Sequence, residues 1–312
     1  MSFCWCTAAL AEPVSVRNLN PLLSGYDLPP ALPSSPPSNA ALSAEFAISN
    51  TSLDQRSAHE SLQLDGELQR WQLSFSRPLN DTLGIRLEVP YPRLSGGGLD
   101  NFIESFHKTF GMPNGNRNVV PTNRLLIQHT RDGVTDVNAT DATSGIGDVT
   151  VRLGKQLGSH TDADVKFNNT LWLSVKLPTG DADKFTGSGS VDVALSFAAS
   201  QQLSPSFVTQ QQVSLSVLGN GDRLSDEQKH VVWNGSLGID ASVTQHWGAV
   251  LQMDGNTRVF TSEIRVLGPA LQLSIGPRYQ SDHWRGSLII SEDIAVDTAP
   301  DVQFQLSLTR KY

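Results

Sequence analysis

The last strand-length stretch of the chain alternates between apolar and uncharged polar side chains and ends on an aromatic residue. The apolar series is Val302, Phe304, Leu306 and Leu308, the polar series is Gln303, Gln305, Ser307 and Thr309, and the final residue is Tyr312. A period of two places the two series on opposite faces of a β-strand. One apolar face, one wet face and a terminal aromatic are typical of the last strand of a transmembrane β-barrel. An edge strand of a soluble β-sandwich is the alternative.

The composition fits a barrel better than a helical membrane protein or an ordinary soluble domain. Charged residues make up 17 % of the chain, against roughly 25 % in typical soluble domains. The chain lacks the run of about 18 apolar residues that a membrane-spanning helix needs. The net charge of -8 is spread over interspersed acids and bases, which argues against a nucleic-acid-binding surface.

The chain starts with a segment that has features of a secretion signal. Residues 1–11 contain a short apolar stretch and end in Ala9-Leu10-Ala11 before Glu12, the pattern of a signal-peptidase site. No Lys or Arg precedes the apolar stretch, so this signal looks truncated at its start. Cleavage would remove Cys4 and Cys6 and leave neither disulfides nor a thiolate metal site.

Residues 12–40 are predicted to form an extended arm in the periplasm. Prolines recur from Pro21 to Pro37, which excludes a helix or a central strand. From Ala41 onward the period-two alternation continues to the end of the chain. We therefore predict that residues 41–312 form one outer-membrane β-barrel.

The connections between the predicted strands alternate in length, as they do in outer-membrane barrels. Short turns fall near residues 158–164, 204–206, 244–246 and 281–283, and longer polar loops fall near residues 178–190, 219–229, 254–268 and 291–301. The predicted fold is all-β, a transmembrane antiparallel up-and-down barrel of about 12–14 strands. The lower count applies if residues 125–128 and 134–138 form only a hairpin within a loop.

Several charged residues fall on the polar face of the predicted strands, which a barrel turns toward its lumen. They are Arg86, Glu88, Arg152, Lys176, Asp192, Asp240, Arg278 and Arg285. Water or opposite charges could satisfy them there. The sequence leaves open whether the lumen is a water-filled channel or is closed by ion pairs and an inserted segment.

Residues 98–111 have helical periodicity and predict one short helix in a long loop, ended by Gly111 and Pro113. Its apolar face needs a surface to cover, and we expect it to plug or constrict the lumen; it consists of Leu99, Phe102, Ile103, Phe106 and Phe110. The other face carries Asp100, Glu104 and His107, adjacent over two turns. Such a set could bind a metal or act in acid–base catalysis, although a solvated face is its commoner role.

The run from Gly96 to His107, with Phe110-Gly111 and Pro113-Asn114-Gly115 after it, resembles a proteobacterial family of uncharacterised envelope proteins, number 3187 among the domains of unknown function. Two further matches are Arg17-Asn18-Leu19-Asn20-Pro21 and Asp65-Gly66-Glu67. The resemblance implies an outer-membrane barrel but supplies no catalytic residues. More distantly, Gly145–Val149 and Lys176–Gly180 are similar to strand ends of barrels from phenol-degradation operons, which are regarded as porins or transporters.

Three functions remain open from the sequence. We favour a non-enzymatic barrel in the bacterial outer membrane, either a porin-like passage for small solutes or a structural barrel. The alternatives are an envelope enzyme that acts on lipid or lipopolysaccharide through Asp100, Glu104 and His107, and a soluble secreted β-sandwich that binds a ligand.

We predict no cofactor and no metal site. The acidic neighbourhood of Asp132, Asp136, Asp141 and Asp148 could hold calcium, but its spacing matches no defined calcium loop, and a solvated loop is favoured. The expected partners are outer-membrane lipid and lipopolysaccharide, and the barrel-assembly machinery through the C-terminal strand, with no nucleic acid.

Overall fold

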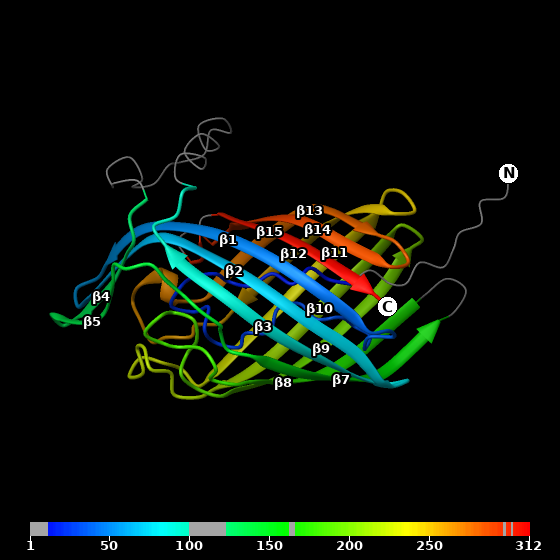
Figure 1. The fold of residues 1–312 in the computed structure, drawn as a ribbon, viewed down its shortest axis with the longest axis horizontal. Helices are drawn as coiled ribbons and strands as arrows, with labels where there is room; N and C mark the ends of the chain where they lie inside the picture. Colours follow the sequence, from blue (N-terminus) through cyan, green and yellow to red (C-terminus); the bar gives the residue numbers. More distant parts are fainter. Residues whose placement is uncertain (1–11, 100–122, 162–165, 296–297, 301) are drawn as a thin grey trace.

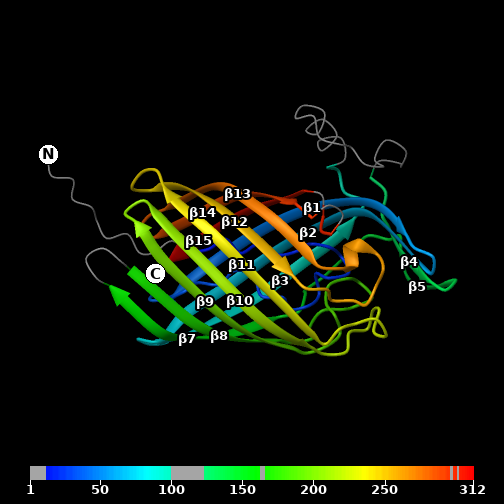
Figure 2. The same cartoon turned by 180° about the vertical axis from the view of Figure 1, so that it is seen from behind.

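The computed structural model describes residues 12–99, 123–161, 166–295, 298–300 and 302–312, and these form one antiparallel sheet that closes on itself (Figures 1 and 2). Its strands are β1 (Ala41–Arg56), β2 (Glu60–Asn80), β3 (Leu83–Ser95), β4 (Leu126–Arg131), β5 (Val134–Ala139), β6 (Thr143–Ser144), β7 (Thr150–Thr161), β8 (Lys166–Lys176), β9 (Asp192–Ser204), β10 (Phe207–Leu218), β11 (Val231–Ser242), β12 (Trp247–Asn256), β13 (Ala270–Gln280), β14 (Trp284–Asp293) and β15 (Val302–Lys311). A short 3-10 helix, η2 (Arg265–Leu267), precedes β13. The sheet closes where β1 pairs with β15, from Ala41 opposite Lys311 to Asn50 opposite Val302.

Twelve of the described strands make the closed wall. Each wall strand pairs with the next one in sequence, except that β3 pairs with β7 across the segment that holds β4 to β6. β4 and β5 form a hairpin that continues β2 beyond the wall, because Glu60–Asp65 of β2 pair with β4 whereas Glu67–Asn80 pair with β3. The lower predicted strand count is therefore the correct one.

The wall is apolar outside and polar inside, the reverse of a water-soluble barrel. On β9, Val193, Leu195 and Phe197 are 40, 47 and 38 % exposed, whereas Asp192 and Ser196 are completely buried. The exposed series continues around the barrel with Trp71, Leu73, Leu153, Leu173, Val213, Leu237, Leu251, Ile275, Leu288 and Leu306. An apolar belt of this extent is stable against lipid hydrocarbon and not against water. The predicted transmembrane antiparallel barrel is confirmed.

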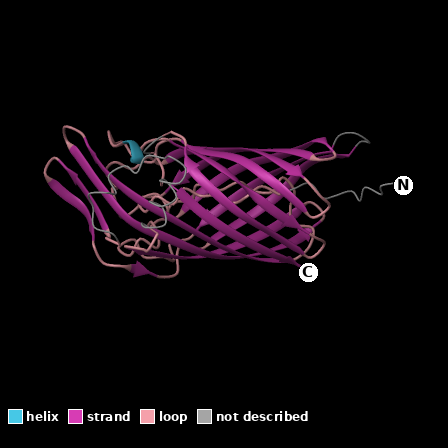
Figure 3. Ribbon diagram, turned by 90° about the horizontal axis from the view of Figure 1, so that it is seen from above, coloured by secondary structure: helices cyan, strands magenta, loops and turns pink. Residues whose placement is uncertain are grey.

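The two ends of the barrel differ in how the strands are joined. Short connections follow β2, β9, β11 and β13 at the end where the C-terminus lies (Figure 3). At the opposite end the strands are joined by the longer loops of residues 177–191, 219–230 and 257–269, beside the β4–β5 hairpin. We call these the short-turn end and the long-loop end.

Two predictions fall outside the described residues in whole or in large part. The secretion signal at residues 1–11 lies entirely outside them. Of the predicted helix, Gly98 and Leu99 are described and are not helical; their N–H groups donate to Glu67 Oε2 at 3.1 and 3.3 Å. Within the described ranges, no helix is long and apolar enough to cross a membrane.

Contact between the apolar outer belt and lipid can be tested at Leu195. Leu195→Arg should lower the free energy of folding into lipid bilayers by roughly 2–4 kcal/mol, because a charge on the lipid face near the midplane loses its hydration. Leu195→Phe, which keeps the position apolar, is the matched control and should change it little. Denaturant titration in bilayers measures both, and an equal effect of the two variants would show that this face does not meet hydrocarbon.

Candidate functional site

The lumen is filled by the arm, residues 12–40 (Figures 1 and 2). The sequence predicts this arm in the periplasm, but the structure places it inside the barrel, where Val16, Leu19 and Leu32 are at most 3 % exposed. The physical reason lies in the polar inner face of the wall, whose buried hydrogen-bonding groups need partners. An extended proline-rich chain supplies carbonyl groups and forms no sheet of its own.

The arm enters at the short-turn end, turns near the long-loop end and returns. At its start Glu12 forms an ion pair with Arg285, near the first residue of β14. The turn falls at residues 20–26, where the N–H groups of Leu23 and Ser24 donate to Asn20 O at 2.9 Å. The chain then runs back through the lumen to β1, which begins at Ala41.

Side-chain amides of the wall bind the backbone of the arm. Gln212 accepts from Leu32 N–H at 2.7 Å and donates to Pro30 O at 2.9 Å. Gln252 binds both the N–H and the C=O of Val14, at 3.2 and 2.9 Å. An amide carries a donor and an acceptor, so each glutamine takes the place of the strand partner that the arm lacks.

Trp172 is the one large aromatic residue that the wall turns against the returning arm. It is 1 % exposed, and its Nε1 donates to Pro33 O at 2.8 Å. Gly154 stands opposite it in the register of β7 and β8. A Cβ at residue 154 would lie 2.7 Å from the indole ring, so this close packing requires glycine.

Arg152 is the centre of a buried ion-pair network in the middle of the lumen. Its side chain is 0 % exposed, with Nη2 2.8 Å from Asp27 Oδ1 of the arm and Nε 3.1 Å from Glu88 Oε1 of β3. Glu88 also accepts from Arg17 of the arm at 3.0 Å and from Arg86 at 2.9 Å. The arm therefore brings one cation and one anion to a network whose wall members also pair with each other.

The other charges predicted for the lumen also lie inside the barrel, in pairs. Lys176 Nζ lies 2.6 Å from Asp148 Oδ2 and 3.2 Å from Asp192 Oδ2. Arg278 binds Asp240. With Arg285 bound to Glu12, every predicted lumen charge has an opposite charge within the described part of the chain.

A hydrophobic cluster, which we call the mouth cluster, closes the long-loop end. It joins Leu19, Leu22, Leu23 and Tyr26 of the arm to Leu62, Leu64 and Leu68 of β2 and to Val259, Phe260 and Val266 of the loop before β13. The rings of Tyr26 and Phe260 meet edge to face with their centroids 6.0 Å apart. The tip of the arm is thus anchored mainly by apolar packing, whereas the rest combines polar contacts with two smaller apolar clusters. These join Val14 and Val16 to Val250 and Ile289, and Leu32 to Trp172 and Ala198.

A second ion-pair network ties the β4–β5 hairpin to the loops beside it. His129 is 0 % exposed and places Nε2 2.7 Å from Glu60 Oε1 and Nδ1 2.6 Å from Asp136 Oδ1. Arg131 lies 2.7 Å from Glu227 of the neighbouring loop. Burial raises the pKa of Glu60, but hydrogen bonds from His129 and Ser262 outweigh burial and hold that pKa below its usual value. Since Asp136 belongs here and Asp148 pairs with Lys176, the acidic residues of this stretch do not gather into one site.

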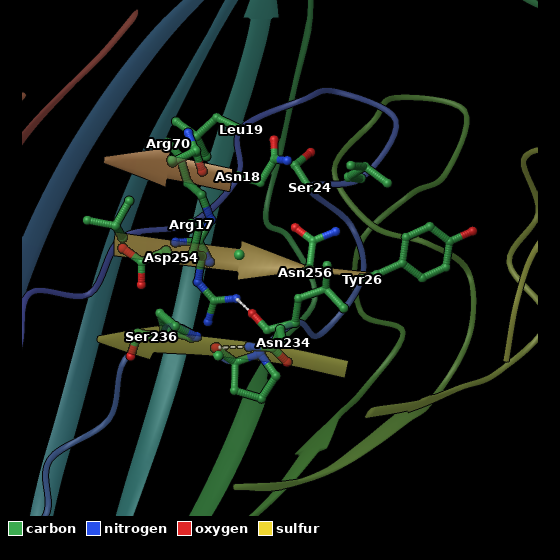
Figure 4. A pocket seen from close by; sticks show the side chains of 18 residues that line it. Arg17, Asn18, Leu19, Ser24, Tyr26, Arg70, Asn234, Ser236, Asp254 and Asn256 are labelled. Carbon is green, nitrogen blue, oxygen red and sulfur yellow. Dashed lines mark hydrogen bonds between the residues drawn. The ribbon is translucent and has the colours of Figure 1, made fainter. Parts of the chain in front are cut away.

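Two small cavities remain between the arm and the wall. The larger, of about 40 Å³, is lined by Arg17, Asn18, Arg70, Asn234, Asp254 and Gln272 among others (Figure 4). The smaller, of about 20 Å³, adjoins it at Arg17 and Arg70 and reaches Pro90 and Pro92. A bound water needs about 10–15 Å³ by this measure, so the larger cavity has room for about three waters and neither is a pore.

All but one of the residues predicted for catalysis or for plugging the lumen lie outside the described residues. Asp100, Glu104 and His107 lie outside the described residues, as do Phe102, Ile103, Phe106 and Phe110. Leu99 is half-buried beside Glu67. The sequence pattern identifies Arg152, Glu88 and Arg285, which bind the arm, but not Trp172 and Gln212 of the wall or Asp27 of the arm. Trp172 could have been noticed, because it is an aromatic residue in the series that faces the lumen.

The fold and its filled lumen define a class: a closed, twelve-stranded antiparallel β-barrel of the outer-membrane type with an internal segment. The chain belongs to the family described as "Protein of unknown function (DUF3187)", whose model matches residues 7–312. No curated protein is significantly similar to it.

Solved structures of similar fold are outer-membrane barrels. The COG4313 outer membrane channel from Pseudomonas putida F1 has a TM-score of 0.58 and 14% sequence identity, with 88% of this chain and 96% of that chain covered. The NanC porin has a TM-score of 0.48 and 8% identity, with 87% and 100% covered. At this level of identity the likeness to the channel concerns the fold alone.

The contribution of the buried ion-pair network to docking of the arm can be tested at Asp27. Asp27→Ala should weaken docking of the arm by roughly 1.5–3 kcal/mol, because its charged hydrogen bonds to buried Arg152 are lost while Glu88 remains a partner of Arg152. Hydrogen exchange at the Leu23 and Ser24 amides of the turn reports docking. Asp54→Ala is the control, because it removes a partially exposed ion pair with Arg56 and should change exchange by no more than about 1 kcal/mol. Unchanged protection in Asp27→Ala would show that these ion pairs do not hold the arm.

Proposed function

We propose that the protein is an outer-membrane channel for small polar solutes, closed in this conformation by its own arm. The observation that carries the proposal is the polar inner face of a complete wall, filled by a segment that contributes no strand to that wall. The apolar outer belt supports lipid as its surroundings and the bacterial outer membrane as its location. We assign the short-turn end to the periplasm, as in other barrels of this type, and recognition by the assembly machinery to β15.

The way the arm is held supports opening by displacement. β1 and β15 close the barrel without the arm, so the arm could leave without breaking a strand ladder. Many of its polar contacts with the wall are hydrogen bonds to glutamine and serine side chains, which water could replace. If Asp27 and Arg17 left together, Arg152 and Arg86 would remain paired with Glu88. The mouth cluster would be the main energetic barrier to opening.

A passage role needs no enzymatic chemistry. The charges that the sequence predicts for the lumen are paired with opposite charges, as Arg152 is with Asp27 and Lys176 with Asp148. The similar solved structures named above are a channel and a porin.

A disulfide that locks the arm to the wall tests the proposal. Ser34 Oγ of the arm and Ser200 Oγ of β9 are 2.6 Å apart, so Ser34→Cys with Ser200→Cys, in a chain with Cys4→Ser and Cys6→Ser, should cross-link. In planar bilayers we expect single-channel openings of the reduced protein to disappear on oxidation and to return on reduction.

The control cross-link leaves the arm free. Ser196→Cys with Ser214→Cys joins two wall strands whose Oγ atoms are 2.8 Å apart, and its oxidation should not change conductance. Openings that persist in the locked arm variant would contradict displacement of the arm. A protein without residues 12–40 that folds but conducts no ions would contradict the passage itself.

A further inference from the structure

Several buried polar atoms at the larger cavity have no hydrogen-bond partner among the described residues. They are Arg17 Nε, Asn18 Nδ2, Gln272 Nε2 and Asn234 Oδ1, and all four side chains line the cavity. Gln272 is only 3 % exposed, so bulk water does not solvate its amide. Because a buried donor without a partner is destabilising, a molecule that accepts hydrogen bonds here stabilises the structure.

Arg70 adds a free cation to these donors. It lies on the inner face of β2 and lines both cavities together with Arg17 (Figure 4). Arg17 is ion-paired, with Nη2 3.0 Å from Glu88 Oε2. Arg70 forms no hydrogen bond or close ion pair with any residue of the described ranges, and only Glu45 and Glu88 attract it, from a greater distance. Two neighbouring guanidinium groups repel each other, and an anion between them removes that repulsion.

We propose that this cavity is a binding site for a small monocarboxylate. A carboxylate accepts hydrogen bonds on two oxygens and matches the forked donors of a guanidinium group. The charges favour a monoanion over a dianion, since Glu88 already pairs with Arg17 and the carboxylate of Asp254 lines the same cavity as Arg70. The volume of about 40 Å³, or room for about three waters, suits an anion of the size of acetate.

Asp254 limits which anions fit. Its carboxylate lines the same cavity, and both of its oxygens accept from Gln252 Nε2, at 3.0 and 2.9 Å. A dianion such as hydrogen phosphate would be repelled by this charge more strongly than a monoanion. The remaining free acceptor, Asn234 Oδ1, needs a donor, which a water bound beside the anion supplies.

The site does not depend on displacement of the arm, so acetate binding and channel conductance can fail separately. Isothermal titration calorimetry of the folded protein in detergent, at constant ionic strength, should show saturable binding of acetate and weaker binding of phosphate. Arg70→Gln should weaken acetate binding by about tenfold or more, because at least one charged hydrogen bond is lost. Arg77→Gln, at an exposed position on the same strand, should leave the Kd within about twofold, since Arg77 lines neither cavity.

Thermal unfolding shows whether each variant still forms the barrel. Arg70→Gln removes no hydrogen bond or close ion pair, and the repulsion by Arg17 that it relieves offsets the lost attraction to Glu45 and Glu88, so its Tm should change little. Gln272→Leu is a second variant, which removes a donor that β13 contributes to the cavity, and it should also weaken acetate binding. The assignment is overturned if the unmodified protein shows no saturable acetate binding, if phosphate binds more tightly than acetate, or if Arg77→Gln loses as much affinity as Arg70→Gln.

Discussion

Hydrogen bonding inside the closed wall is the constraint on which the rest of the structure depends. Because the outer face is committed to apolar side chains, every polar alternate of the twelve wall strands points inward. In an open channel water would satisfy these groups; here the arm does so, through contacts such as Gln212 with Pro30 and Trp172 with Pro33. The charges follow the same rule, since Arg152 is fully buried and binds carboxylates of both the arm and the wall.

The arm is held differently at its tip and along its length. Along the lumen its contacts combine hydrogen bonds and ion pairs, which water could partly replace, with small apolar clusters around Val16 and Leu32. At the long-loop end Leu22, Leu23 and Tyr26 are packed in the mouth cluster, and water cannot replace apolar packing. Under the proposed function, the arm is therefore anchored most firmly at its tip, and changes at the mouth cluster should affect opening more than changes along its length.

The sequence predicts the wall far better than the contents of the lumen. Strict alternation, as in Val193 to Phe197, fixes which face of a strand meets lipid, and the loop lengths fix the up-and-down order. Arg86, Glu88 and Arg152 are predicted to face inward because they alternate with the apolar residues of their strands. Their partners could not be predicted, since the stagger of the strands decides which residues meet across the lumen.

The arm shows why the contents of the lumen could not be predicted from the sequence. Its prolines exclude regular structure but do not say where the chain goes, and Asp27 lies 125 positions from its partner Arg152. In retrospect the apolar residues Leu19, Leu22 and Leu23 indicate that the arm is buried, because a segment free in the periplasm would leave them exposed. The donors at Arg70 and Gln272 give no sequence signal, because only the packed lumen shows that they lack partners.

Thiol labelling of the arm in a bilayer tests the central claim, that residues 12–40 occupy the lumen, most directly. Ser34→Cys in the chain with Cys4→Ser and Cys6→Ser places a thiol at a site that is 8 % exposed inside the barrel. Asp81→Cys places one in the exposed turn between β2 and β3. With a bulky, membrane-impermeant maleimide applied to the short-turn end, we expect prompt labelling at residue 81. Labelling at residue 34 should be far slower, at the rate of arm opening. Equal rates at the two positions would contradict the claim.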